Sequence, residues 1–280
     1  MLRYATGLIA IFAACLGAQT LALRLSGGKT LKSESNYFSS IARIQTESQN
    51  TPKIMLLGSS MTGRLGDRAQ RFEGVANLGC DGGSAIVTLR AMDHGILPVA
   101  PLLIIEANSL SFELEGRGKE IGAAIDSHWF EVGIRTPNLG ATARPTAFAY
   151  SWLMARKLGS DPNASQELLP ISTRPSVLDP ATAPALDEKA TALVGEVTAI
   201  LDRLRKKGCD FLIVTLPPAS PPDSLQSKIP RAIAARSGTR WWDLTDGLPD
   251  GSVSFSDGLH LDAPSAQKVM LTLMREANPH

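Results

Sequence analysis

The feature that most constrains the fold is a short run, Pro101–Glu106 (PLLIIE), in which every residue before the final glutamate is apolar. A strand with one face in water alternates apolar and polar residues, whereas a central parallel strand is covered on both faces and is apolar throughout. We expect four more short strands, at Lys53–Gly58, Gly74–Gly79, Phe211–Leu216 and Thr239–Leu244. We therefore predict a sheet of five parallel strands.

Segments of helical character separate these runs. We expect a short helix or turn at Arg64–Arg71 and helices at about Ser84–His94, Pro184–Lys207, Ser224–Ala235 and Ala263–Ala277. Strands that alternate with helices form a parallel sheet with helices on both faces. The predicted fold class is therefore α/β, in three layers, with the functional loops at the carboxyl ends of the strands.

The N-terminal segment is not expected to belong to this domain. Ala5–Leu23 is apolar apart from two threonines and a glutamine, and Arg3 and Arg24 flank it. Its 19 residues fit a short membrane-spanning helix and also a long signal peptide. We expect residues 1–24 to be an anchor or signal peptide, residues 25–52 a linker with a short helix, and residues 53–280 the domain, outside the cytoplasm. The flanking positive charges do not settle the orientation.

Composition excludes some functions. The chain has 28 basic and 27 acidic residues and a net charge of +1, without a basic run, so we expect no nucleic-acid partner. We find no cluster with metal-ligand spacing, and Gly58–Gly63 lacks the lysine of a phosphate-binding loop. We therefore expect neither a metal nor a cofactor.

Residues typical of acyl-transfer chemistry follow the predicted strands. Gly58-Ser59-Ser60 follows the first strand, a glycine-rich turn follows the second, Asn108 follows the third, and Asp257-Gly-Leu-His260 precedes the last helix. A serine hydroxyl needs a base, and a histidine held by an aspartate is the usual one. Taken singly, Ser60 could be a helix cap, Asn108 a turn residue and His260 a surface histidine. Ser59 is expected to cap the helix or to donate to Asp257.

These residues resemble the sequence blocks of the SGNH/GDSL hydrolases, in the same order and on the same elements. Gly58-Ser59-Ser60 matches the family's Gly-Asp-Ser block, and residues 77–82 match its Asn-x-Gly-x-x-Gly block. Residues 106–109 match the Gly-x-Asn-Asp block, and Asp257 to His260 match Asp-x-x-His. Ser59 stands where the family has Asp, and Glu106 and Ser109 replace Gly and Asp.

The resemblance implies a flavodoxin-like SGNH hydrolase fold with a five-stranded parallel sheet and an insertion at about 110–183, after strand three. It also implies a catalytic triad of Ser60, His260 and Asp257. The oxyanion hole would use the backbone N–H of Ser60, the backbone N–H of Gly79 and the side-chain amide of Asn108. We expected glycine at 79 because a side chain there would crowd the oxyanion.

The departures and the N-terminal segment resemble the branch of the family that acts on acyl groups of cell-surface carbohydrates. The implied activity is a serine esterase that removes O-acyl groups, such as O-acetyl, from an envelope polysaccharide or glycolipid. An O-acetyltransferase with the same triad remains open, as does a lysophospholipase or thioesterase. A non-catalytic carbohydrate-binding or envelope-assembly subunit is a further alternative. The expected location is the inner membrane with the domain in the periplasm, or secretion if the N-terminal segment is cleaved.

The insertion and the cysteines lead to two further expectations. Six aromatic residues in the insertion would either line a surface for a sugar ring or acyl chain, or form a small satellite core. They are Phe112, Trp129, Phe130, Phe148, Tyr150 and Trp152. We considered whether 147–158 lies on a membrane as an interfacial helix. Cys80 and Cys209 are expected at opposite edges of the sheet, too far apart for a disulfide.

Overall fold

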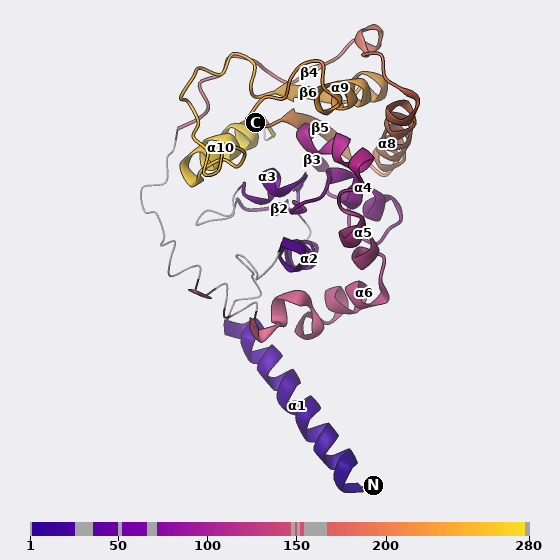
Figure 1. Cartoon of the computed structure of the whole chain (residues 1–280), viewed down its shortest axis with the longest axis vertical. Helices are drawn as coiled ribbons and strands as arrows, with labels where there is room; N and C mark the ends of the chain where they lie inside the picture. Colours follow the sequence, from indigo (N-terminus) through magenta and orange to yellow (C-terminus); the bar gives the residue numbers. More distant parts are fainter. Residues whose placement is uncertain are drawn as a thin grey trace.

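The structure is a computed structural model that describes residues 2–25, 36–49, 52–65, 72–146, 149, 152–153 and 167–277 (Figure 1). The strands are β1 (Ile54–Leu57), β2 (Val75–Asn77), β3 (Leu102–Glu106), β4 (Ser176–Val177), β5 (Asp210–Thr215) and β6 (Arg240–Asp243). The helices are α1 (Leu2–Leu25), α2 (Asn36–Glu47), α3 (Ser60–Gly63), α4 (Ala85–Asp93), α5 (Lys119–Ile125), α6 (His128–Arg135), α8 (Glu188–Lys206), α9 (Leu225–Ser237) and α10 (Ala263–Ala277). Short 3-10 helices are η1 (Ala107–Glu115), η2 (Pro137–Leu139), η3 (Ala141–Ala143) and η4 (Pro180–Thr182).

The strands form one six-stranded sheet in the order β2-β1-β3-β5-β6-β4. The first five strands in this order are parallel, and they lie within or one residue from the five predicted runs. β4 pairs antiparallel with β6 at the edge. The prediction of an α/β fold is confirmed, but the sheet is mixed and has one strand more than we expected. β4 was missed because it has two exposed residues and no apolar run.

Alternate residues of each central strand pack into two different cores. Met55, Leu57, Leu103 and Ile105 face a core shared with α2, α4, α8 and α9. Ile54, Leu56, Leu102 and Ile104 face a second core shared with α10. Because the sheet is covered on both faces, β1 and the residues of β3 that precede Glu106 are apolar at every position. Figure 1 shows the resulting layers, with α10 on one side of the sheet and α4 and α8 on the other.

Three of the predicted helices, α4, α9 and α10, begin within one residue of the predicted position. Ser84 caps α4 and Ser224 caps α9 through their side-chain oxygens. α10 spans the predicted range. α8 begins at Glu188, later than predicted, because the carboxylate of Asp187 accepts a hydrogen bond from the N–H of Ala190 and caps the helix there. The short helix expected at 64–71 falls largely outside the described residues.

The two helices that precede β1 differ in how far they are buried. α2, in the predicted linker 25–52, packs Ile41, Ala42 and Ile44 into the main core. α1 is apolar, almost wholly exposed, and long enough to cross a membrane by length and composition, a test that a signal sequence also passes. The predicted linker therefore adds a helix to the domain, whereas α1 projects from it (Figure 1).

The described aromatic residues of the insertion do not form a separate core. Phe130 is only 3% exposed and joins the main core, whereas Trp129 is 77% exposed. Phe112 lies under the guanidinium of Arg117. Phe148 and Tyr150 lie outside the described residues, as does most of the interfacial helix considered at 147–158. The aromatic residues that the structure describes are therefore distributed between the core and the surface.

Candidate active site

The nucleophile candidate lies on a sharp turn between β1 and α3. Gly58 follows the last residue of β1, and Ser59 is the N-cap of α3, where its hydroxyl accepts a hydrogen bond from the N–H of Met61. Ser60 is the first residue of α3 and is half-buried. Ser59 therefore caps the helix, which leaves the hydroxyl of Ser60 available for another contact.

The structure brings Ser60, His260 and Asp257 together. The Oγ of Ser60 lies 2.8 Å from Nε2 of His260. The Nδ1 of the same ring lies 2.8 Å from Oδ2 of Asp257. With a proton on Nδ1, the imidazole donates to the aspartate and leaves Nε2 free to accept the serine proton. This is the arrangement that an activated serine requires.

The loop that carries His260 and Asp257 is held at its base. Phe255 and Leu261 form an isolated antiparallel bridge, and the N–H of Ser256 donates to the carbonyl of His260. Leu261 is buried in the core beneath α10. Within the loop, Asp257 Oδ1 accepts hydrogen bonds from the N–H groups of His260 and Leu259. The carboxylate is therefore oriented by its own turn before it contacts the imidazole.

The environment of Asp257 favours its ionised form. Hydrogen bonds from the backbone N–H and then the side chain of His260 hold the pKa of this carboxyl well below its usual range. Arg64 Nη1 lies 3.6 Å from Asp257 Oδ2 and donates to the hydroxyl of Ser256. The side chain of Asp257 is 47% exposed and that of His260 is 14% exposed, so the site opens to solvent.

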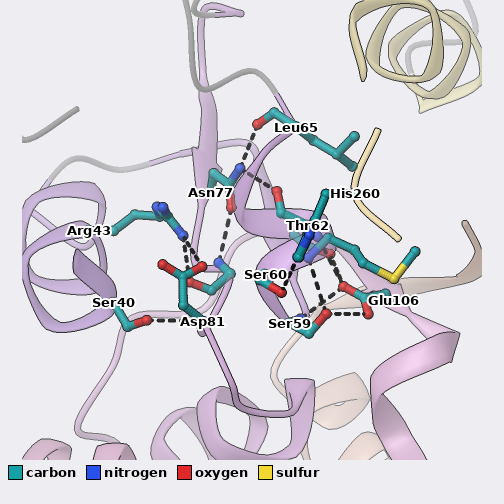
Figure 2. Close-up of polar contacts among 12 residues, drawn as sticks. Ser40, Arg43, Ser59, Ser60, Thr62, Leu65, Asn77, Asp81, Glu106 and His260 are labelled. Carbon is teal, nitrogen blue, oxygen red and sulfur yellow. Dashed lines mark hydrogen bonds and ion pairs between the residues drawn. The ribbon is translucent and has the colours of Figure 1, made fainter. Parts of the chain in front are cut away.

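A buried carboxylate lies directly beneath the Ser60 turn, and the sequence analysis did not assign it a role. Glu106 accepts hydrogen bonds from the N–H and hydroxyl of Ser59 and from the N–H and hydroxyl of Thr62, at 2.6 to 3.1 Å (Figure 2). Burial raises the pKa of Glu106, and these four hydrogen bonds oppose that rise. Thus Ser59 and Glu106, two of the residues that depart from the family pattern, contact each other. Ser59 stands where the family has an aspartate, and Glu106 supplies a carboxylate at this turn.

Glycines allow this close packing. A side chain at Gly58 would clash with Thr62 and Glu106, and one at Gly79 would clash with the backbone of Gly63 and Ser59. The N–H of Gly79 already donates to Asn77 Oδ1, at 3.0 Å. In this structure the N–H of Gly79 is therefore engaged within its own loop, and its role as an oxyanion donor stays a prediction. Glycine is required at 79 because the loop after β2 packs against α3.

Asn77 and Arg43 hold the same loop in place. The side-chain amide of Asn77 donates to the carbonyls of Thr62 and Leu65. Arg43, on α2, donates to the carbonyl of Gly79 and lies 3.7 Å from the carboxylate of Asp81. Figure 2 shows these contacts beside Ser60 and His260. Helix α2 is therefore part of the support of the site; the sequence predicted a short helix within the linker there, at about 37–45, but not this role.

Asn108 also has a structural role. Its Nδ2 donates to the carbonyl of Leu216 at 2.9 Å, and its Oδ1 accepts from the N–H of Leu216 at 2.8 Å. The side chain is buried and holds the segment that follows β5. Its Nδ2 also lies 3.5 Å from the carbonyl oxygen of Pro218, and its role as an oxyanion donor stays a prediction.

We expect Asn108→Ala to destabilise the fold. The change leaves the buried N–H and C=O of Leu216 without partners, at a cost of about 1–3 kcal/mol. Chemical denaturation, read against wild type, measures this loss. A variant with unchanged stability and much lower turnover would instead support Asn108 as an oxyanion donor.

Metal ligands and cysteine thiols are the other side chains that could carry chemistry. Across the described ranges, His, Cys, Asp and Glu side chains form no group of three that could hold a metal ion. Cys80 and Cys209 are free and buried, and burial raises the pKa of each thiol to about 12. Both cysteines are therefore protonated at neutral pH and unsuited to act as nucleophiles.

Comparisons with protein-family models, with curated proteins and with solved structures found no match to this chain.

Proposed function

We propose that this chain is a serine esterase of the SGNH type, anchored to the inner membrane with its domain in the periplasm. The observation that carries the proposal is the unbroken chain of hydrogen bonds from Ser60 through His260 to Asp257. The three residues come from two loops 200 positions apart in sequence, so a local structural role does not explain why they meet. The position of Ser60 after the first parallel strand and the sheet order β2-β1-β3-β5-β6 are what a flavodoxin-like SGNH fold requires.

The proposed reaction begins when Ser60 Oγ attacks the carbonyl carbon of an ester and His260 Nε2 takes the hydroxyl proton. The tetrahedral intermediate collapses as the imidazolium returns this proton to the leaving alcohol, which leaves an acyl group on Ser60. Water, deprotonated by His260, then attacks the acyl-enzyme and releases the acid. Asp257 stays ionised and keeps the imidazole in the tautomer that this exchange needs.

The oxyanion needs donors that are not already used. The backbone N–H of Ser60, the first residue of α3, has no hydrogen-bond partner among the residues that the structure describes. We propose this N–H as the first oxyanion donor, and the backbone N–H of Gly79 and the side-chain amide of Asn108 remain the candidates for the others. Loss of one such donor typically costs about 3–4 kcal/mol of barrier.

The exposure of the triad supports an acyl group on a large substrate. Asp257 lies at the surface and His260 is only partly covered, so an ester presented on a polymer can reach Ser60 without entering a deep tunnel. We propose an O-acyl group, such as O-acetyl, on an envelope polysaccharide or glycolipid. If a sugar hydroxyl replaces water in the second step, the same triad makes the chain an O-acetyltransferase.

Covalent labelling tests the proposed chemistry. The full chain in detergent is treated with a fluorophosphonate, and the adduct is mapped by mass spectrometry. We expect an adduct on Ser60 that disappears in His260→Ala, because the unassisted hydroxyl is a poor nucleophile. A folded protein that gives no adduct, or an adduct that persists without His260, would contradict the proposal and favour a non-catalytic binding subunit.

A further inference from the structure

The C-terminal end of α1 packs against the domain. Ala22 is 4% exposed, whereas Leu21 and Leu25 beside it are 57% and 62% exposed. The helix packs here against η2 and η3 (Figure 1). Thus one side of the last turns of α1 is already covered by the domain, and the other side is open.

The length of α1 leaves no spare turn between a bilayer and this contact. The apolar stretch Ala5–Leu23 has 19 residues, which at 1.5 Å per residue extends about 28 Å. The hydrocarbon core of a bilayer is about 30 Å thick, so a spanning α1 needs the whole stretch. Because Ala22 belongs both to this stretch and to the contact with the domain, η2 and η3 must lie at the surface of the bilayer.

The part of the domain beside this contact exposes apolar side chains. On α6, Phe130 and Gly133 are buried, whereas Trp129 is 77% exposed. Val132 lies three residues after Trp129, on the same side of α6. The exposed chain then continues through Thr136 and Pro137 to η2, where Leu139 is 43% exposed. We call this surface, formed by Trp129, Val132, Thr136, Pro137 and Leu139, the α6–η2 face.

The charges around the α6–η2 face suit a lipid surface. Arg135 is 76% exposed and pairs with Glu131 on the flank of α6, and Arg24 lies in the last turn of α1. Tryptophan is enriched at membrane–water interfaces, and arginine is favourable near anionic headgroups. A helix that faces only water gains nothing from an exposed tryptophan beside a membrane-spanning helix.

We propose that the α6–η2 face lies in the headgroup region of the bilayer that α1 spans, so that the domain rests on the membrane in a fixed orientation. The occupant of this face is lipid. The inference takes α1 as a retained anchor and does not depend on the chemistry of Ser60. It goes beyond the proposed esterase function because it assigns a second surface of contact to the membrane.

The test places an environment-sensitive fluorophore on the face. Trp129→Cys and, as a second position, Leu139→Cys are made in a Cys15→Ser background and labelled with a maleimide of the NBD dye. Cys80 and Cys209 are buried and stay protonated, so they should not react. The control is Val177→Cys on β4, an apolar side chain that is 61% exposed on the edge strand of the sheet.

Each full-length labelled variant is reconstituted into vesicles of phosphatidylcholine and phosphatidylglycerol. The quenching of NBD fluorescence by spin-labelled lipid is then measured. We expect blue-shifted emission and severalfold stronger quenching at 129 and 139 than at 177. Equal quenching at all three positions would overturn the proposal, as would an intact mass that lacks α1. Fluorophosphonate labelling of Ser60 on the same samples shows separately whether the proposed active site is intact.

Discussion

Replacing Ser60 with alanine is expected to lower the turnover of a short acyl ester by about four to six orders of magnitude. The Oγ of Ser60 is the atom that His260 contacts, and alanine has no group that can form the acyl-enzyme. Substrate binding should change little, because the lost interaction forms mainly in the transition state. Steady-state kinetics with a chromogenic acetyl ester measures both effects.

A matched control separates catalysis from helix capping. Ser224 caps α9 through its hydroxyl, so Ser224→Ala should cost about 1 kcal/mol of stability and leave turnover near wild type. If Ser60→Ala behaves like Ser224→Ala, with a small loss of stability and normal turnover, Ser60 is a structural residue. The proposed function would then be wrong.

Glu106→Ala is expected to destabilise the fold by about 3–5 kcal/mol, the largest loss of stability that we predict. The change leaves four buried donors on Ser59 and Thr62 without their acceptor and opens a cavity beneath the Ser60 turn. Because Ser59 and Thr62 flank the nucleophile region, the variant should also lose turnover at temperatures at which it remains folded. Urea denaturation and single-temperature kinetics measure the two effects.

The control for the stability of Glu106→Ala is the same substitution at an exposed glutamate. Glu131 is 51% exposed and pairs with Arg135 four residues later, so Glu131→Ala should cost less than about 1 kcal/mol. A Glu106→Ala variant as stable as Glu131→Ala would show that the Ser60 turn does not depend on the buried carboxylate.

The local elements of the fold could be predicted because their signals are local. The run PLLIIE is apolar at every position before its end, and β3 lies within it as a strand buried on both faces. Ser84 and Ser224 begin helices because their hydroxyls satisfy the first free N–H groups. β4 was missed because its two exposed residues give no apolar pattern. The start of α8 was misplaced because a single aspartate, Asp187, is too weak a signal to mark a cap.

The candidate site was only partly predictable. Ser60, Asp257 and His260 could be named because each lies in a short motif, and the structure places them within hydrogen-bonding distance. Glu106 was visible as a charge at the end of an apolar strand, but its partners were not. The hydrogen bonds of Asn108 with Leu216 and of Gly79 with Asn77 could not be predicted, because no short-range signal in the sequence marks them.

The sequence alone therefore determined the α/β class, the positions of the parallel strands and the residues that could act as nucleophile, base and orienting acid. Only the tertiary structure decided which polar groups already have partners, that α2 supports the active-site loop, and that the end of α1 packs against η2 and η3. The reason is distance along the chain. Secondary structure depends on neighbours within a few residues, whereas Ser59 meets Glu106 across 47 positions and Ser60 meets His260 across 200.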